Sequence, residues 1–172
     1  KKKLTDKQLI FVSNHQSFID ALVVAGVFPA KILKKTSFLA IDLYFKKGLM
    51  KYIAENANIV VIDINNNIKH TIEEITNALK QGKNILIFPE GARTKDGKVG
   101  QFKKVFAILA KELNISVQCI GIKGAFEAYS RYMKFPKPRK IEVKVLEKFS
   151  PEGTYEEIAA KAENIIREYV EN

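Results

Sequence analysis

A histidine and an aspartate five positions apart form the feature of this sequence with the clearest chemical potential. His15 and Asp20 stand in the segment NHQSFID at residues 14–20. Imidazole accepts a proton near neutral pH, and a carboxylate beside it fixes the ring tautomer. Five positions are about 140° apart around a straight helix. The two side chains can therefore meet only if His15 lies in a turn and Asp20 in the first turn of a helix, where they would act as a general base and its partner.

The residues around this segment predict how it is positioned. Residues 9–12 form an apolar run typical of a buried strand, and residues 21–28 form a second run typical of a helix. Between the runs, Ser17 and Asp20 fit the S-x-x-[DE] pattern of a helix capping box. An alternative without catalysis is open: Asp20 would serve only the helix start, and His15 would be a hydrogen-bonded turn residue.

A second polar segment follows another apolar run. Residues 84–88 read NILIF and precede PEGART. Proline ends a strand because it lacks an N–H, and glycine permits close approaches that other residues resist. Arginine offers a planar fork suited to phosphate. Ligands gather where strands of open α/β sheets end, so this segment predicts a binding site, with a solvated polar turn as the alternative.

Together the two segments resemble the glycerophosphate acyltransferase superfamily, specifically the 1-acylglycerol-3-phosphate acyltransferases. Residues 14–20 match its N-H-x-x-x-x-D block, residues 88–94 match its F-P-E-G-[TA]-R-[ST] block, and residues 102–104 resemble its downstream F-K-K segment. The resemblance implies that His15 is the general base and that Asp20 orients it. The residues that it implies for substrate binding are Asn14, Ser17, Glu90, Gly91, Arg93, Thr94, Lys103 and Lys104.

Two departures from the family pattern affect the expected substrate. Ile64 follows the strand at residues 59–63, where the family usually has an arginine, and the strand around Cys119 lacks the usual proline. Residues 124–129 and 135–138 look most like acyltransferase domains fused to acyl-activating ligases. We therefore expect a fused or associated ligase domain as one partner.

The resemblance implies an O-acyltransferase that moves a fatty acyl group from acyl-CoA or acyl carrier protein to the free hydroxyl of 1-acylglycerol-3-phosphate. The acceptor hydroxyl would be the nucleophile, and backbone N–H groups after His15 would stabilise the oxyanion. Because Ile64 replaces an arginine, a lysophosphatidylethanolamine-type acceptor is an alternative. Two more alternatives are a non-catalytic module that binds lipid or acyl carrier protein, and a thioester hydrolase.

Composition sets the class of protein. The chain has 172 residues, of which 47% are hydrophobic and 28% charged, as expected for one globular domain. Its one cysteine, Cys119, excludes an internal disulfide and favours a reducing compartment. The histidines at positions 15 and 70 give no metal-ligand spacing. We expect neither a metal nor a cofactor, the thioester being a co-substrate.

The sequence has no apolar run near the roughly 20 residues that span a bilayer, and no signal-peptide pattern. We expect a single domain over residues 1–172, cut from a longer chain or lacking an N-terminal element. Its expected location is the cytoplasm, peripheral to the inner face of the cell membrane.

A net charge of +10 points to anionic partners. Aromatic and basic residues alternate between residues 123 and 140, a composition suited to an anionic membrane surface. The alternative is a loop whose rings pack onto the core. Nucleic acid is not expected, because no recognised binding motif is present.

Strand and helix patterns alternate along the whole chain. Strands are predicted near residues 9–12, 59–64, 84–88, 116–122 and 140–147, and helices over 101–113, from Thr71 to Gly82, from Thr154 to Val170, and as a pair within 37–56. This alternation predicts an α/β fold with a mixed, mostly parallel sheet and helices on both faces.

Overall fold

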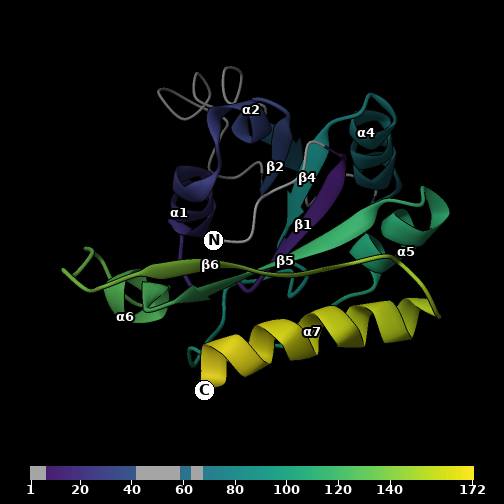
Figure 1. The fold of residues 1–172 in the computed structure, drawn as a ribbon. Coiled ribbons are helices and arrows are strands. Elements are labelled where there is room, and N and C mark those ends of the chain that lie inside the picture. The colour runs from purple at the N-terminus through teal and green to yellow at the C-terminus, as the bar shows by residue number, and fades with distance from the viewer. Residues whose placement is uncertain (1–6, 42–58, 63–67) are drawn as a thin grey trace.

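The computed structural model describes residues 7–41, 59–62 and 68–172 (Figure 1). The strands are β1 (Leu9–Ser13), β2 (Thr36–Ile41), β3 (Ile59–Ile62), β4 (Asn84–Ile87), β5 (Ser116–Lys123) and β6 (Glu142–Phe149). The helices are α1 (Asp20–Val27), α2 (Ala30–Leu33), α4 (Ile68–Lys80), α5 (Val105–Glu112), α6 (Ala125–Tyr129) and α7 (Tyr155–Glu171).

The strands within these ranges form one sheet in the order β3-β2-β4-β1-β5-β6. Every neighbouring pair is parallel except β5 and β6, which are antiparallel. The central strand β1 lies between β4 and β5, and all five of its residues are buried. Parallel strands buried on both faces read as continuous apolar runs, which is why LIFV was recognisable. The predicted mixed, mostly parallel sheet is confirmed.

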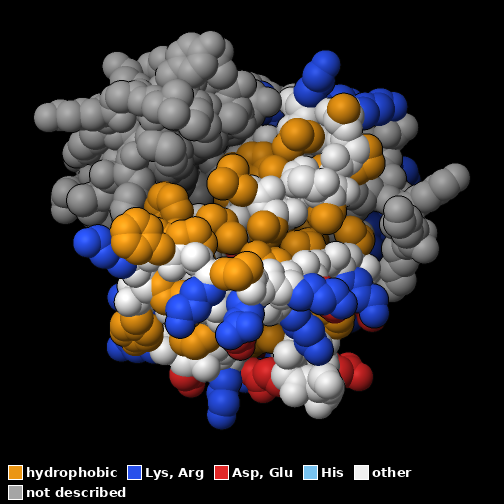
Figure 2. All heavy atoms as spheres, turned by 90° about the vertical axis from the view of Figure 1, so that its left-hand side faces the viewer, with side chains coloured by type: hydrophobic (Ala, Val, Ile, Leu, Met, Phe, Trp, Pro, Cys, Tyr) orange, Lys and Arg blue, Asp and Glu red, His pale blue; other side chains and the backbone are white. Residues whose placement is uncertain are grey.

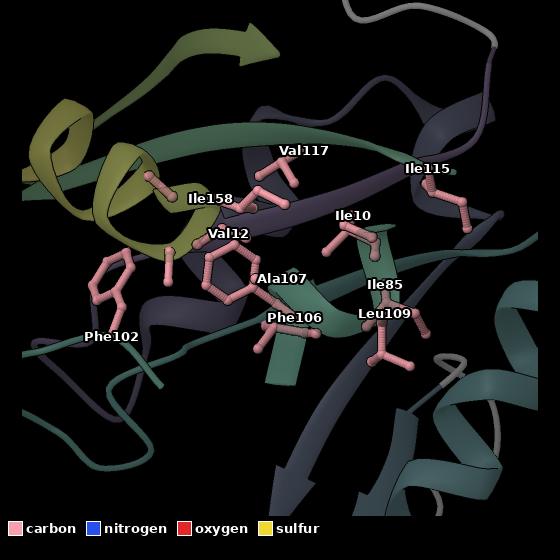
Figure 3. Packing of buried hydrophobic residues seen from close by; sticks show 14 of the residues in the cluster. Ile10, Val12, Ile85, Phe102, Phe106, Ala107, Leu109, Ile115, Val117 and Ile158 are labelled. Atoms are coloured by element: carbon pink, nitrogen blue, oxygen red, sulfur yellow. The ribbon is translucent and has the colours of Figure 1, made fainter. Parts of the chain in front are cut away.

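Alternate residues of β1 face two separate hydrophobic cores, as the two-residue period of a strand requires. Ile10 and Val12 pack with α4, α5 and α7 on one face, the core drawn in Figure 3. Leu9 and Phe11 pack with α1, α2 and α6 on the other face. Helices therefore cover both faces of the sheet, as predicted. Among the described residues no helix combines the length and the apolar character needed to cross a membrane.

The strand predictions are confirmed with shifts of a few residues, and the Thr154 capping box is present with both of its hydrogen bonds. Three helix predictions differ from the structure. Residues 36–41 form β2 where a helical pair was expected, and the rest of that expectation lies outside the described residues. Helix α4 begins at Ile68, so Thr71 lies inside it, and α5 begins only at Val105.

Candidate active site

The two sequence motifs meet at the carboxyl ends of two neighbouring strands, β1 and β4. β1 and β4 are parallel neighbours, with Ile10 opposite Ile85, so the segments that follow them emerge side by side. Two backbone groups of His15 join the segments: its N–H donates to Glu90 Oε1 at 2.7 Å, and its carbonyl accepts from the Thr94 N–H at 2.8 Å. The motifs are thus parts of one site.

The predicted His–Asp pair is formed. His15 Nδ1 lies 2.8 Å from Asp20 Oδ2, with His15 in the turn after β1 and Asp20 at the first position of α1. Since the carboxylate can only accept, the ring donates from Nδ1 and keeps the lone pair of Nε2. The ring also stacks on Phe88, with 4.4 Å between centroids. The His15 side chain is 23% exposed. An oriented imidazole that remains accessible can act as a general base.

Asp20 organises the turn as well as the ring. Its Oδ2 also accepts from the N–H groups of Gln16 at 2.6 Å and Ser17 at 2.7 Å, and its side chain is fully buried. The expected capping box is not formed: the N-cap of α1 is Ile19, which makes no side-chain capping bond, and Ser17 Oγ donates to the Tyr129 carbonyl at 2.6 Å. The N–H groups of residues 15–17 all donate to carboxylates, so they do not form the expected oxyanion site.

Glu90 connects the turn at His15 with a third segment. Oε1 accepts from His15, and Oε2 accepts from the Gly100 N–H at 2.9 Å. Burial raises the pKa of the Glu90 carboxyl above its usual value, and its hydrogen bonds with His15 and Gly100 act in the opposite direction. A carboxylate that accepts two backbone N–H groups is a positioning group, and its negative charge would oppose a phosphate. We therefore assign Glu90 to the framework of the site.

Three motif side chains anchor the turn to β5 and α6. The Asn14 amide donates to the carbonyl of Ile122 at 2.9 Å and accepts from the N–H of the same residue at 2.8 Å. Gln16 donates to the Gly97 carbonyl and accepts from the Ala125 N–H. Ser17 is the third, through its bond to α6. All three are buried. We interpret Asn14 and Ser17 as positioning residues, since their polar groups are engaged within the protein.

The other predicted binding residues lie around Gly91. Thr94 is buried, and its hydroxyl accepts from the Gly97 N–H at 3.2 Å. Gly91 has φ +74°, and a Cβ added there would lie 2.6 Å from Lys103 Nζ. The positive φ favours glycine at this position, and the Lys103 side chain passes close to it. Lys104 instead pairs with Glu156 of α7, at 2.5 Å. A substrate contact of Lys103 or Lys104 stays a prediction.

Arg93 is one of the residues that line an open, basic cavity of about 420 Å³. Its guanidinium lies 5.9 Å from the centroid of the Phe18 ring, and its carbonyl accepts from Arg131 at 3.3 Å. The cations that line the cavity are Arg93, Lys95, Lys98 and Arg167, beside the carboxylates of Glu90 and Asp96. A phosphate would find several positively charged donors there. Ile64, the departure expected to weaken phosphate binding, lies outside the described residues.

The sequence did not reveal three contributors to the site. Phe88 was placed in the strand and in the second motif but given no role in the site. Gln16 was passed over, and Arg167 lies far along the chain from both motifs. Gln16 could have been noticed, because a polar residue between two motif positions in a buried turn needs partners. Arg167 carried no signal, since basic residues are common on exposed helix faces.

Comparisons with known proteins agree with the motifs. A family model described as Acyltransferase matches residues 1–123. A 1-acyl-sn-glycerol-3-phosphate acyltransferase of Chlamydomonas reinhardtii is 32% identical over 120 residues, 69% of this chain and 35% of that protein. The mouse 1-acyl-sn-glycerol-3-phosphate acyltransferase alpha is 29% identical over 164 residues, 91% of this chain and 55% of that protein.

The same similarity holds for the fold. The crystal structure of the 1-acyl-sn-glycerophosphate acyltransferase PlsC from Thermotoga maritima superposes with a TM-score of 0.81 and 26% identity, covering 98% of this chain and 67% of that one. This chain spans about a third of the algal relative and about half of the mouse relative. With a family model matching most of its length and both motifs joined in one site, the chain belongs to the acyltransferase family, in the glycerophosphate acyltransferase superfamily.

Proposed function

We propose that this domain transfers a fatty acyl group from a thioester, acyl-CoA or acyl carrier protein, to the free hydroxyl of 1-acylglycerol-3-phosphate. The observation that carries the proposal is the bond of His15 Nδ1 to Asp20 Oδ2 at 2.8 Å. Glu90, which accepts from the His15 N–H, lines the cavity together with Arg93. The relatives in Chlamydomonas and mouse carry the name of this activity.

The chemistry needs only the pair and the two substrates. His15 Nε2 takes the proton of the acceptor hydroxyl while its oxygen bonds to the thioester carbonyl carbon. Asp20 stabilises the imidazolium that results, as a buried carboxylate does in hydrolase triads. The tetrahedral intermediate then expels the thiolate, and the imidazolium returns the proton to sulfur. The products are an ester and a free thiol, and the protein is unchanged.

The basic cavity is the proposed binding site for the phosphate of the acceptor. A phosphate monoester carries up to two negative charges, and Arg93 can bind two of its oxygens at once. Because Thr94 follows Arg93 and bonds to the His15 carbonyl, the cavity and the base are joined by adjacent residues. A phosphate held by Arg93 would therefore stand at a fixed position relative to the imidazole.

A phosphodiester acceptor of the lysophosphatidylethanolamine type is the second candidate, favoured by Ile64 in place of an arginine. It would accompany a fused or associated acyl-activating ligase domain. The experiment compares turnover of the two acceptors at matched acyl chains by the purified chain, with acyl-CoA and acyl carrier protein as donors. Faster acylation of the phosphodiester lipid would replace the first acceptor by the second.

The same experiment tests the alternatives of other classes. Release of fatty acid at an equal rate without acceptor would indicate a thioester hydrolase. Binding of lipid or carrier protein with no product from either acceptor would indicate a non-catalytic module. An intact, oriented His15 supports the transferase, because a binding module has no use for an activated base.

An acceptor of this kind resides in a membrane, so we also propose that the domain works at the inner face of the cell membrane, as a peripheral protein. α1 and the segment after α6 lie on the left of Figure 1, and Figure 2 shows hydrophobic side chains gathered on that side with Lys and Arg around them. Tyr132 and Phe135 are 68% and 71% exposed, and Leu22 is 66% exposed. Each ring lies near a cation, Arg131 or Lys134.

This surface fits anionic phospholipid, because each cation near such a surface contributes about 1 kcal/mol that salt screens. Binding to vesicles with anionic lipid should weaken between low and high salt. Charge reversal at Arg131, Lys134 and Lys137 should produce the same loss at low salt. If the chain ignores anionic vesicles at low salt, the membrane proposal is wrong, and titration with acyl carrier protein tests the other acidic partner.

A further inference from the structure

The segment that follows Arg93 is held by carboxylates from two parts of the chain. Residues 97–102, here the 97–102 loop, present backbone N–H groups to three of them. Gly100 donates to Glu90, whereas the other two acceptors belong to α7: Val99 donates to Glu171 Oε1 at 3.1 Å, and Phe102 donates to Glu163 Oε2 at 2.8 Å.

One arginine joins the two carboxylates of α7. Arg167 Nη2 donates to Glu163 Oε1 at 2.8 Å, and Nη1 donates to Glu171 Oε1 at 3.1 Å. The spacing of four residues on each side places the three side chains on one face of the helix. We name these three residues the α7 clamp. Each glutamate of the clamp thus accepts from the loop and from Arg167 together.

A continuous series of hydrogen bonds connects α7 with the backbone of His15. The clamp holds Val99 and Phe102, Gly100 between them bonds to Glu90 Oε2, and Glu90 Oε1 accepts from His15. A Cβ at Gly100 would lie 2.9 Å from Glu90 Oε2, so the loop passes close to this carboxylate. Arg167 also lines the basic cavity with Arg93.

We propose that the α7 clamp is a positioning element of the acceptor site: it fixes the 97–102 loop, of which residues 98–101 line the cavity together with Arg93. The residues lie beyond the stretch matched by the family model, which ends at residue 123. The inference rests on the proposed function for its substrate, the phosphate of the acceptor, but its geometry stands on the hydrogen bonds alone.

The clamp can be removed without undocking the helix. α7 is attached to the sheet by four buried side chains, Ile158, Ala159, Ala162 and Ile166, and its first turn carries a complete capping box. The clamp residues, in contrast, are partly exposed, with side-chain exposures of 20% for Glu163, 37% for Arg167 and 32% for Glu171. Variants at these positions should therefore fold.

The first test measures amide hydrogen exchange in the full chain by NMR. Arg167→Ala should accelerate exchange at Val99, Gly100 and Phe102 by about 2- to 10-fold, the effect of losing partly exposed ion pairs. Arg167→Lys should give a smaller change, because an ammonium lacks the planar fork. Glu163→Ala should accelerate Phe102 strongly, and Glu163→Gln should do so less, since the amide oxygen still accepts.

A matched control removes a different cation from the same helix. Lys161 pairs with Glu147 at 3.5 Å, so Lys161→Ala should leave exchange in the loop and the kinetics unchanged. Unchanged exchange of the three loop amides in Arg167→Ala would overturn the inference, and this result does not depend on any enzymatic activity.

The second test is kinetic. Arg167→Ala should raise the acceptor KM by about 2- to 10-fold with the donor KM within twofold, and Arg167→Lys should partly restore it. Faster exchange with an unchanged acceptor KM would also overturn the positioning role. If the wild-type chain transfers no acyl group, the proposed function fails, and exchange still decides whether the clamp holds the loop.

Discussion

Removing the imidazole of His15 separates catalysis from folding more cleanly than any other change at this site. In His15→Ala the acceptor hydroxyl loses its general base, and we expect kcat to fall by about 10²–10⁴. The cost in folding free energy follows from two contacts. The stack on Phe88 is worth about 0.5–1.5 kcal/mol, and the bond to Asp20 about 1–3 kcal/mol.

The sum, about 1.5–4.5 kcal/mol, is below the usual stability of a domain, about 5–15 kcal/mol. Asp20 keeps its two backbone donors, Gln16 and Ser17, so the turn remains tied. Asp20→Ala would instead leave both N–H groups and the imidazole without their acceptor, and unfolding would obscure its kinetics. His15→Ala is therefore the variant to interpret.

The assay follows thiol release from acyl-CoA, or from acyl carrier protein, with and without 1-acylglycerol-3-phosphate. Circular dichroism and a melting curve accompany it, and the melting temperature should drop by about 3–18 °C, at 2–4 °C per kcal/mol. Activity within a few-fold of wild type, from protein that melts cooperatively above the assay temperature, would refute His15 as the base.

Three further predictions concern binding, backbone and thiol chemistry. Arg93→Ala should raise the acceptor KM about tenfold or more with little change in the donor KM, because a charged hydrogen bond to the acceptor phosphate is lost. An equal rise in both KM values would indicate that Arg93 has a structural role. Gly124→Ala should destabilise the fold more than Gly82→Ala in chemical denaturation. Both glycines have φ +79°, which costs an alanine about 1–2 kcal/mol. At Gly124 the new Cβ would also overlap the Lys140 carbonyl, whereas open space surrounds Gly82. Equal losses of stability in the two variants would contradict this steric clash. Burial raises the pKa of Cys119 to about 12, so iodoacetamide at pH 8 should label it only after unfolding, and labelling of the native protein at the rate of a free thiol would show that the strand opens.

The local parts of the site were predictable because each motif is short. His15 and Asp20 are five positions apart, and the sequence predicted the turn and helix start that bring them together. The bond of Glu90 to His15 was not predictable, because it joins residues 75 positions apart. That contact exists only because β1 and β4 are neighbours in the sheet. The prediction that Glu90 binds substrate came from its motif, whereas the partners of Glu90 in the structure are the backbone N–H groups of His15 and Gly100.

The wrong helix expectations have similar causes. Residues 36–41 show no period that separates strand from helix, and the segment is extended because it pairs with β3 and β4 on either side. Thr71 fits a capping box in sequence, but α4 has already begun at Ile68. A pattern of four residues cannot exclude an earlier start, whereas the Thr154 box coincides with the actual beginning of α7.

The long spacing between partners also determines when the site can form during biosynthesis. Asn14 forms a hydrogen bond with Ile122, 108 positions later in the chain, and Phe102 forms one with Glu163, 61 positions later. Neither bond can form before the second residue has been synthesised. Closing such long loops slows folding, because their entropy is lost before the contacts are made. A nascent chain that already contains both motifs but has not released α7 from the ribosome would lack the bond of Phe102 to Glu163. Transferase activity should therefore emerge only after α7 has left the exit tunnel.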